Sequence, residues 1–97
     1  MNLKTKITKL PNGGELYEHS NGFKQWSLNH QYHREDGHAV EWPNGDKIWY
    51  INGKPHREDG PAIDYINGDK RWYLNGIQLD CTTQEEFERL MKLKAFW

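Results

Sequence analysis

The sequence predicts a mainly β protein, an antiparallel meander of three 23-residue β-hairpin repeats with an extra N-terminal strand and a C-terminal capping α-helix. Three observations support this fold class: a 23-residue unit that recurs without gaps, paired Asn-Gly turn signals in the units, and a helix-capping pattern after the last unit. The 97 residues are expected to form a single domain, with an N-terminal strand and cap (1–13), three repeats (14–82) and a helix (83–97).

The repeat is clearest in residues 37–59 and 60–82, which align without a gap and share ten positions, including an Asn-Gly-Asp-Lys run. Residues 14–36 form a further copy, which keeps one Asn-Gly pair, a Trp and the full His-Arg-Glu-Asp run at 33–36. A fixed period of about 20 to 50 residues is typical of repeat architectures, in which each unit buries its apolar face only by stacking on its neighbours.

Each unit is expected to form a β-hairpin. The Asn-Gly pairs at 44–45 and 52–53 lie between short aromatic and β-branched runs. This pattern predicts type I′ turns, because Asn and Gly tolerate the positive φ that such turns require. Residues 46–51 are then the strand between the two turns, and residues 39–42 are the partner strand, entered through an Asp-Gly turn.

Side-chain alternation along strand 46–51 puts Trp49 and Ile51 on one face and Tyr50 on the other. The pair of a tryptophan and an aliphatic residue recurs in all three copies, so this face is expected to form the core. Two sets of partner-strand residues are expected to meet it, namely Val40, Ile63 and Tyr17, and Trp42, Tyr65 and His19. The tyrosines of the opposite face are expected to be exposed.

The two ends differ from the repeats, as capping segments do. Residues 4–10, followed by Pro-Asn-Gly-Gly, look like an extra strand and turn. After residue 82, a capping box of Thr83 with Glu86, or of Thr82 with Glu85, predicts a helix start. The helix is expected to fold over the last strand or the apolar sheet face, and the alternative is a partner-binding helix.

Composition and charge exclude several classes of function. The 13 Lys and Arg against 14 Asp and Glu give a net charge of −1, which forms no basic field for nucleic acid or a membrane surface. No apolar stretch has the length of a membrane span or a signal peptide. The single Cys81 excludes an internal disulfide and fits a reducing compartment, so we expect a cytoplasmic protein.

The signature Trp-Tyr-x-Asn-Gly-x-x-His-Arg-Glu-Asp-Gly-Pro-Ala, present at 49–62, resembles the MORN-like repeat family, and the resemblance covers residues 14–82. Repeats of this variant are familiar from small bacterial, bacteriophage and giant-virus proteins. MORN-like repeats occur in membrane-junction proteins, as accessory modules of enzymes, and in small antitoxin-type and phage-borne proteins. Arg34 and Arg57 stand where the ordinary MORN pattern has Gly, so phospholipid binding is not carried over.

The His-Arg-Glu-Asp runs are the only concentrated polar constellation in the sequence. If repeats stack, His33 and His56 lie about 9–10 Å apart, which is too far to share a metal ion. A structural or surface-recognition role is therefore favoured over metal binding or catalysis, with Asp before Gly closing a turn and Arg pairing with a carboxylate. Cys81 is interpreted as a packed residue rather than a nucleophile.

These observations predict a non-enzymatic protein-binding module with no cofactor, no metal site and no catalytic residue. The resemblance implies a small stoichiometric inhibitor of a bacterial defence or host enzyme, as anti-CRISPR-type phage proteins act. The alternatives are an antitoxin or immunity protein and a metal- or ligand-binding accessory domain. The partner is expected to be a bacterial protein, and the N-terminal strand edge is the favoured route to a homodimer. The expected partner-binding residues are His33, Arg34, Glu35, Tyr50, His56, Arg57, Glu58, Tyr73 and Trp97.

Overall fold

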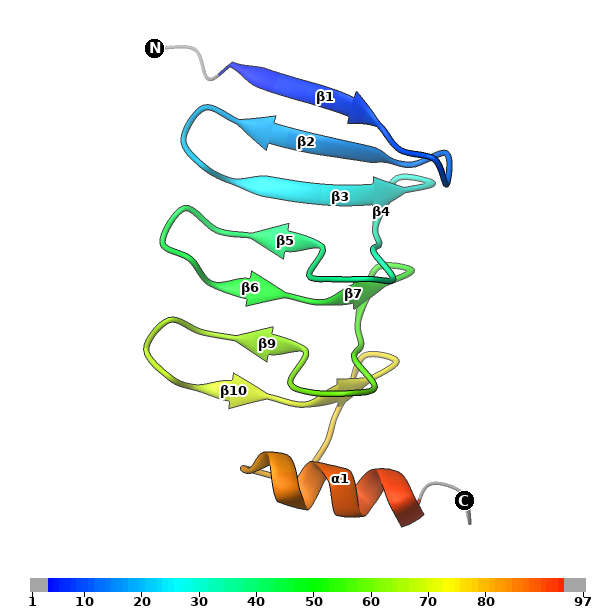
Figure 1. Ribbon diagram of the computed structural model, residues 1–97, viewed down its shortest axis with the longest axis vertical. Helices are drawn as coiled ribbons and strands as arrows, with labels where there is room; N and C mark the ends of the chain where they lie inside the picture. The colour runs from blue at the N-terminus through cyan, green and yellow to red at the C-terminus, as the bar shows by residue number, and fades with distance from the viewer. Residues whose placement is uncertain (1–3, 94–97) are drawn as a thin grey trace.

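The computed structural model describes residues 4–93 and has the expected architecture, an antiparallel β meander followed by a C-terminal helix (Figure 1). The elements are β1 (Thr5–Lys9), β2 (Glu15–His19), β3 (Lys24–Leu28), β4 (Gln31–Tyr32), β5 (Val40–Glu41), β6 (Lys47–Ile48), β7 (Tyr50–Ile51), β8 (Lys54–Pro55), β9 (Ile63–Asp64), β10 (Lys70–Arg71), β11 (Tyr73–Leu74), β12 (Ile77–Gln78) and α1 (Gln84–Leu93). Among the described residues, no helix is long and apolar enough to cross a membrane.

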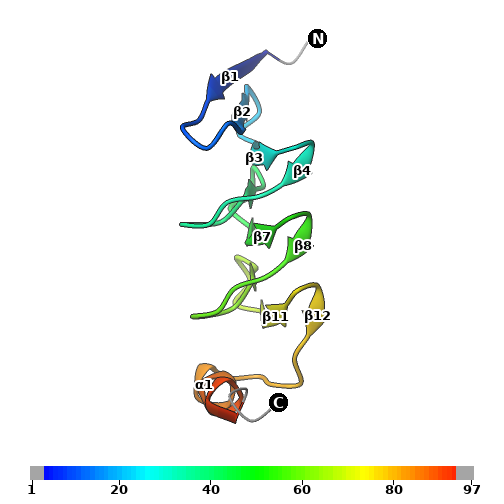
Figure 2. The same cartoon turned by 90° about the vertical axis from the view of Figure 1, so that its right-hand side faces the viewer.

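The main sheet runs β1-β2-β3-β5-β6-β9-β10, with every neighbouring pair antiparallel. Each repeat adds a small hairpin, namely β3–β4, β7–β8 or β11–β12. Figure 2 shows the small hairpins on one side of the sheet and the loops that lead into β5 and β9 on the other. The molecule measures 49 × 31 × 16 Å, so the sheet is a single layer.

The expected strand 46–51 is divided into β6 and β7 at Trp49. The Trp49 N–H donates to the carbonyl of Ala62 in the next repeat at 2.7 Å, whereas its own carbonyl accepts from His56 N–H at 3.1 Å. The backbone of Trp49 therefore joins the main sheet to the segment that follows the small hairpin. Trp26 makes the equivalent two bonds within the continuous strand β3.

The two Asn-Gly turns of a repeat are of different types, although type I′ was expected for both. Asn52 and Gly53 have φ of 50° and 79° and join β7 to β8 as a two-residue type I′ loop, as expected. At the other turn only Gly45 has positive φ, at 101°, and Trp42 N–H donates to Asp46 O. This loop therefore has three residues, with Gly in the left-handed position.

Because this loop has three residues, the prediction that Val40 meets the tryptophan face is wrong. A two-residue loop would have placed Val40 opposite Trp49, whereas the observed register pairs Val40 with Ile48. Because a one-residue change of register moves side chains to the other face, Val40 lies on the face opposite Trp49. The tryptophans instead lie beside small residues, since Trp49 N–H bonds the Ala62 carbonyl.

The core lies on both sides of the sheet and deepens towards the helix. Its buried apolar residues are Ala39, Val40, Ala62, Ile63, Trp72, Leu74 and Phe87. Trp26 and Trp49 are half-buried. The expected core assignment of the tryptophan face therefore holds fully for Trp72, which is 2 % exposed.

Helix α1 caps the last repeat. Phe87, 1 % exposed, has its ring centroid 6.4 Å from that of Trp72, and Gln84 Oε1 accepts a hydrogen bond from Trp72 Nε1 at 3.1 Å. Of the two expected capping boxes, the pair Thr83 and Glu86 forms, because Glu86 N–H donates to Thr83 Oγ1 at 3.2 Å. The hydroxyl of Thr82 donates to the side-chain carboxylate of Glu86 at 3.0 Å. This hydrogen bond is the largest cause of the lowered pKa of Glu86.

Candidate partner-binding face

The two histidines of the His-Arg-Glu-Asp loops join one repeat to the next. His33 is 7 % exposed, and its Nδ1 accepts the backbone N–H of Asn52 at 3.0 Å. His56 makes the same bond to Asn75 N–H at 2.9 Å. An Nδ1 that accepts must be unprotonated, which leaves the proton on Nε2. The His33 Nε2 lies 3.6 Å from a carboxylate oxygen of Glu35, and the His56 Nε2 lies 3.7 Å from one of Glu58.

The two arginines of these loops cover the tryptophans. The Arg57 guanidinium lies 3.9 Å from the ring centroid of Trp49, bonds Asp59 at 2.7 Å and donates to the carbonyl of Pro61 at 3.2 Å. A Cβ at Gly60 would lie only 2.9 Å from Cζ of Arg57, so a side chain at this position would displace the stacked guanidinium. Arg34 makes the equivalent contacts with Trp26, Asp36 and the carbonyl of His38.

These loops therefore use their basic side chains inside the molecule and present carboxylates outward. Glu35 and Glu58 are exposed, as are Asp36 and Asp59. Within residues 4–93, no three His, Cys, Asp or Glu side chains lie close enough together to hold a metal ion. The loops act as clamps between repeats, a role that the sequence favoured as the structural alternative.

The other side of the sheet carries the five tyrosines of the chain. The rings of Tyr32 and Tyr50 lie 5.2 Å apart, and Tyr17 and Tyr32 line a shared groove of about 520 Å³. Burial raises the pKa of the Tyr50 phenol, and the nearby phenols of three other tyrosines raise it further. These three are Tyr32, Tyr65 and Tyr73. We call this surface the tyrosine face and define it by Tyr17, Tyr32, Tyr50, Tyr65 and Tyr73.

An exposed apolar rim continues the tyrosine face at the hairpin turns. Trp42 is 47 % exposed, and its ring centroid lies 4.7 Å from that of Phe23. Ile66, at the equivalent turn of the next repeat, is 64 % exposed and lies against Gly45. Side-chain alternation places Trp42 on the side of Val40, which is the side of the tyrosines.

The structure thus divides the expected site residues between two faces. Tyr50 and Tyr73 lie together on the tyrosine face. The two His-Arg-Glu-Asp loops lie over the tryptophans, on the opposite side of the sheet. Trp97 lies outside the described residues.

Tyr17, Tyr65 and Trp42 were expected on the tryptophan face rather than the outer face. That expectation assumed a two-residue turn, which shifts the register by one residue and so exchanges the two faces of their strands. The available signal was the length of the loop: Pro43 before the Asn-Gly pair leaves room for a three-residue turn.

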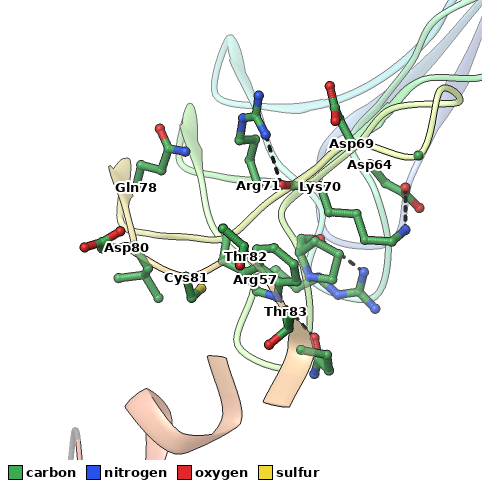
Figure 3. Close-up of a pocket in the computed structure, with 15 residues that line it drawn as sticks. Arg57, Asp64, Asp69, Lys70, Arg71, Gln78, Asp80, Cys81, Thr82 and Thr83 are labelled. Atoms are coloured by element: carbon green, nitrogen blue, oxygen red, sulfur yellow. Dashed lines mark hydrogen bonds and ion pairs between the residues drawn. The ribbon is translucent and has the colours of Figure 1, made fainter. Parts of the chain in front are cut away.

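Two further titratable groups lie away from the tyrosine face. His38 contacts the edge of the Trp26 ring and bonds Glu41 at 2.9 Å. Burial, helped by the nearby charges of Arg34 and Lys47, lowers its pKa, although the Glu41 carboxylate acts in the opposite direction. Cys81 lines a cleft of about 880 Å³ between the last repeat and the start of α1 (Figure 3). Burial, together with Glu86 and Asp80, raises the pKa of the Cys81 thiol, which favours the protonated, unreactive form.

Comparison of the chain with protein-family models, curated proteins and solved structures gives no match.

Proposed function

We propose that the chain is a non-enzymatic protein-binding module that contacts its partner through the tyrosine face. The observation that carries the proposal is the gathering of all five tyrosines on one side of a single-layer sheet, next to the exposed Trp42 and Ile66 of the turn rim. Tyrosine and tryptophan are enriched at interface hot spots, because large rings bury much area for little lost side-chain entropy.

The loops on the opposite side support this role by making the tyrosine face rigid. Each His-Arg-Glu-Asp loop fixes its repeat to the next through the imidazole, the guanidinium and the backbone. Arg34 N–H, for example, donates to the carbonyl of Tyr50 at 3.0 Å, so a loop residue directly holds a tyrosine of the binding face. A preorganised surface loses little conformational freedom on binding, which favours affinity.

We extend the proposal to the biochemical role. The resemblance of the repeat to MORN-like repeats of small bacterial and phage proteins supports a stoichiometric inhibitor of a bacterial defence or host enzyme, acting in the cytoplasm. A rigid face suits this role, since such an inhibitor acts by occupying the surface of its target.

Affinity capture from bacterial lysate, read by quantitative mass spectrometry, tests the proposal. The wild-type chain is compared with a Tyr32→Ala, Trp42→Ala double variant, whose replaced side chains are both exposed. The matched control is Glu35→Ala, an exposed residue on the opposite side. We expect one protein to be retained near stoichiometry by the wild type and the control, lost from the double variant, and inhibited by the wild-type chain. A partner that the double variant retains as well as the wild type contradicts the tyrosine face as the binding surface.

A further inference from the structure

One row of residues across the main sheet alternates in charge on every strand. Directly paired residues give the order Lys6, Glu18, Lys24, Glu41, Lys47, Asp64 and Lys70. Opposite charges directly across neighbouring strands stabilise a sheet and disfavour a slipped register. Each inner lysine of the row therefore has an acidic residue on both sides.

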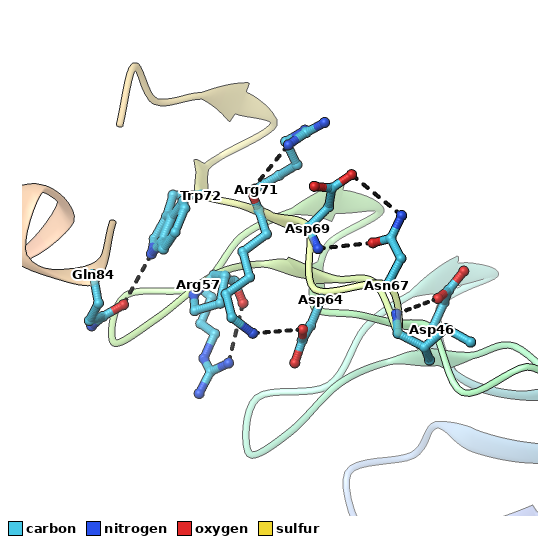
Figure 4. Close-up of polar contacts among 11 residues, drawn as sticks. Asp46, Arg57, Asp64, Asn67, Asp69, Arg71, Trp72 and Gln84 are labelled. Carbon is cyan, nitrogen blue, oxygen red and sulfur yellow. Dashed lines mark hydrogen bonds and ion pairs between the residues drawn. The ribbon is translucent and has the colours of Figure 1, made fainter. Parts of the chain in front are cut away.

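The row ends unbalanced at β10. Lys47 lies between Glu41 and Asp64, whereas Lys70 pairs only with Asp64, at 2.9 Å, and β10 ends the strand order. Beside Lys70 stands Arg71, at the position where the preceding repeat has Ile48. The Arg71 guanidinium bonds the carbonyl of Lys70 at 3.3 Å and is otherwise exposed (Figure 4). The edge is therefore more basic than any inner strand pair.

The backbone at this edge is also arranged to receive another strand. In the first two repeats the N–H of Trp26 and of Trp49 donates to an alanine carbonyl of the next repeat at 2.7 Å. No repeat follows Trp72, and α1 contacts its ring rather than pairing with β10. Figure 1 shows α1 below β10 and displaced along the strand direction, towards the end of the strands where β7 lies, and Figure 2 shows it on the side of the loops rather than of the small hairpins.

The cleft of about 880 Å³ described above opens along this edge and is lined by Lys70, Arg71 and Trp72. Two of its acidic residues already have partners: Asp64 is bonded to Lys70, and Asp69 to the side chain of Asn67. Asp80 lies at the other end, near Gln78 (Figure 3). Along β10, Lys70 has an acidic residue across from it on one side only, and Arg71 bonds a backbone carbonyl. An acidic side chain in an added strand would therefore complete the charge row at Lys70 and lie beside Arg71.

We propose that the edge of β10 binds an extended, acidic segment of a partner protein, which adds an antiparallel strand to the sheet. The molecule shows the pattern that such a strand needs. The strand that pairs with Lys47 and Ile48 reads Ala62, Ile63, Asp64, a small, an aliphatic and an acidic residue. Main-chain bonds supply the affinity of such strand addition, and side chains supply its specificity.

Charge argues for a partner protein rather than a second copy of the chain. The row begins with Lys6 on β1 and ends with Lys70 on β10, so both edges of the sheet carry a lysine at this position. Joining β1 of one copy to β10 of another, or two copies of β10, would set like charges opposite each other, which is destabilising. An acidic strand from another protein completes the alternation instead.

The test is an NMR titration of the ¹⁵N-labelled full chain with a peptide that copies residues 60–66, Gly-Pro-Ala-Ile-Asp-Tyr-Ile. A second peptide carries Asp64→Lys, and protein variants carry Lys70→Glu or, as a matched control at the opposite edge, Lys6→Glu. Both lysines are exposed, and the unchanged amide spectrum away from the substitution verifies that each variant is folded. Titration to about 1 mM peptide covers the affinity range of weak encounters.

We expect shifts concentrated at the amides of residues 69–72, with affinity for the acidic peptide about fivefold above that for the lysine peptide. Lys70→Glu should reverse this preference, and Lys6→Glu should leave it unchanged. The absence of binding, equal binding of both peptides, or shifts centred on the tyrosine face would overturn the proposal.

Discussion

The two sides of the sheet use their polar and aromatic residues in opposite ways. On the loop side, His33 and Arg34 make hydrogen bonds to Asn52, to Asp36 and to the backbone carbonyl of His38, and Arg34 covers a tryptophan. On the tyrosine face, Tyr32 contacts Tyr50 but stays 37 % exposed. The His-Arg-Glu-Asp run, the most conspicuous motif of the sequence, is therefore a structural clamp. The surface that we propose for a partner is the tyrosine face, on the opposite side of the sheet.

This contrast predicts that changes on the loop side alter stability, whereas changes on the tyrosine face alter binding. The largest effect on stability is expected where the loop side is most completely buried, beneath α1. Phe87→Ala removes the fully buried ring that covers Trp72 and should lower the free energy of unfolding by about 3–5 kcal/mol. Urea unfolding followed by tryptophan fluorescence measures it, with Glu88→Ala on the exposed side of the same helix as the control. A loss below about 1 kcal/mol would mean that α1 does not hold the last repeat.

The next effect concerns the imidazole between repeats. His33→Ala removes a buried imidazole and leaves the partly buried Asn52 N–H without its acceptor, which should destabilise the fold by about 1–3 kcal/mol. His56→Ala should have a smaller effect, because its side chain is more exposed, 16 % against 7 %. Denaturant unfolding of both variants ranks them, and the opposite ranking would contradict the explanation by burial.

A smaller effect on stability is expected when the planar guanidinium of Arg57 over Trp49 is replaced by an ammonium group. Arg57→Lys keeps the charge but loses the planar stack and the simultaneous bonds to Asp59 and Pro61, at about 1 kcal/mol. Thermal unfolding followed by circular dichroism measures the change. Arg71→Lys, at an exposed position with only one backbone contact, is the control and should be nearly neutral. Equal effects at both positions would show that stacking contributes nothing.

The smallest effect is a pH dependence from His38. Burial lowers its pKa below 6.5, so the ring is neutral in both folded and unfolded chains at high pH, whereas the unfolded chain binds the proton first as pH falls. Its contribution to stability is therefore complete above pH 6.5 and is lost as pH falls from there through the lower pKa of the folded state. The difference in unfolding free energy between wild type and His38→Gln, measured at several pH values, should shift against the wild type over this window. A difference that is independent of pH, or that shifts in favour of the wild type, would refute the assignment.

The sequence was sufficient for the period, the meander, the N-terminal strand and the capping helix, because turn residues and a 23-residue repeat are local signals. It was insufficient for the faces, because these depend on loop length. The Asn-Gly pair at 52–53 forms the expected type I′ turn, but Pro43 joins Asn44 and Gly45 in a longer loop that shifts the register by one residue. That one-residue shift alone places Val40 and Trp42 on the tyrosine face instead of the expected tryptophan face.

The candidate site was predictable only in part for the same reason. Tyr50 and Tyr73 lie on the face opposite the tryptophans, as alternation along their own strand predicted, but the expectation that they are exposed was wrong, because both are half-buried. Tyr32 lies in a two-residue strand that follows the turn at Asn29 and His30, where neither residue is Gly and both have positive φ. No Asn-Gly signal marks this turn, and the pairing of its strand with β3 emerged only from the structure.

The residues of the charged row could also have been identified from the sequence. Lys24, Lys47 and Lys70 are separated by the repeat length, as are Glu18, Glu41 and Asp64. Their alternation across the sheet, however, requires the register between repeats, and that register is held by Trp N–H bonds to alanine carbonyls that no periodicity predicts.

The most direct measurement is the affinity of two folded variants for the captured partner, His33→Ala from the loop side and the Tyr32→Ala, Trp42→Ala pair from the tyrosine face. Isothermal titration at a temperature where both remain folded should give at least about a tenfold loss of affinity for the second and a smaller loss for the first, which only makes the tyrosine face less rigid. Full affinity of the tyrosine-face variant, with binding lost in the folded loop variant, would contradict the assignment of the two faces.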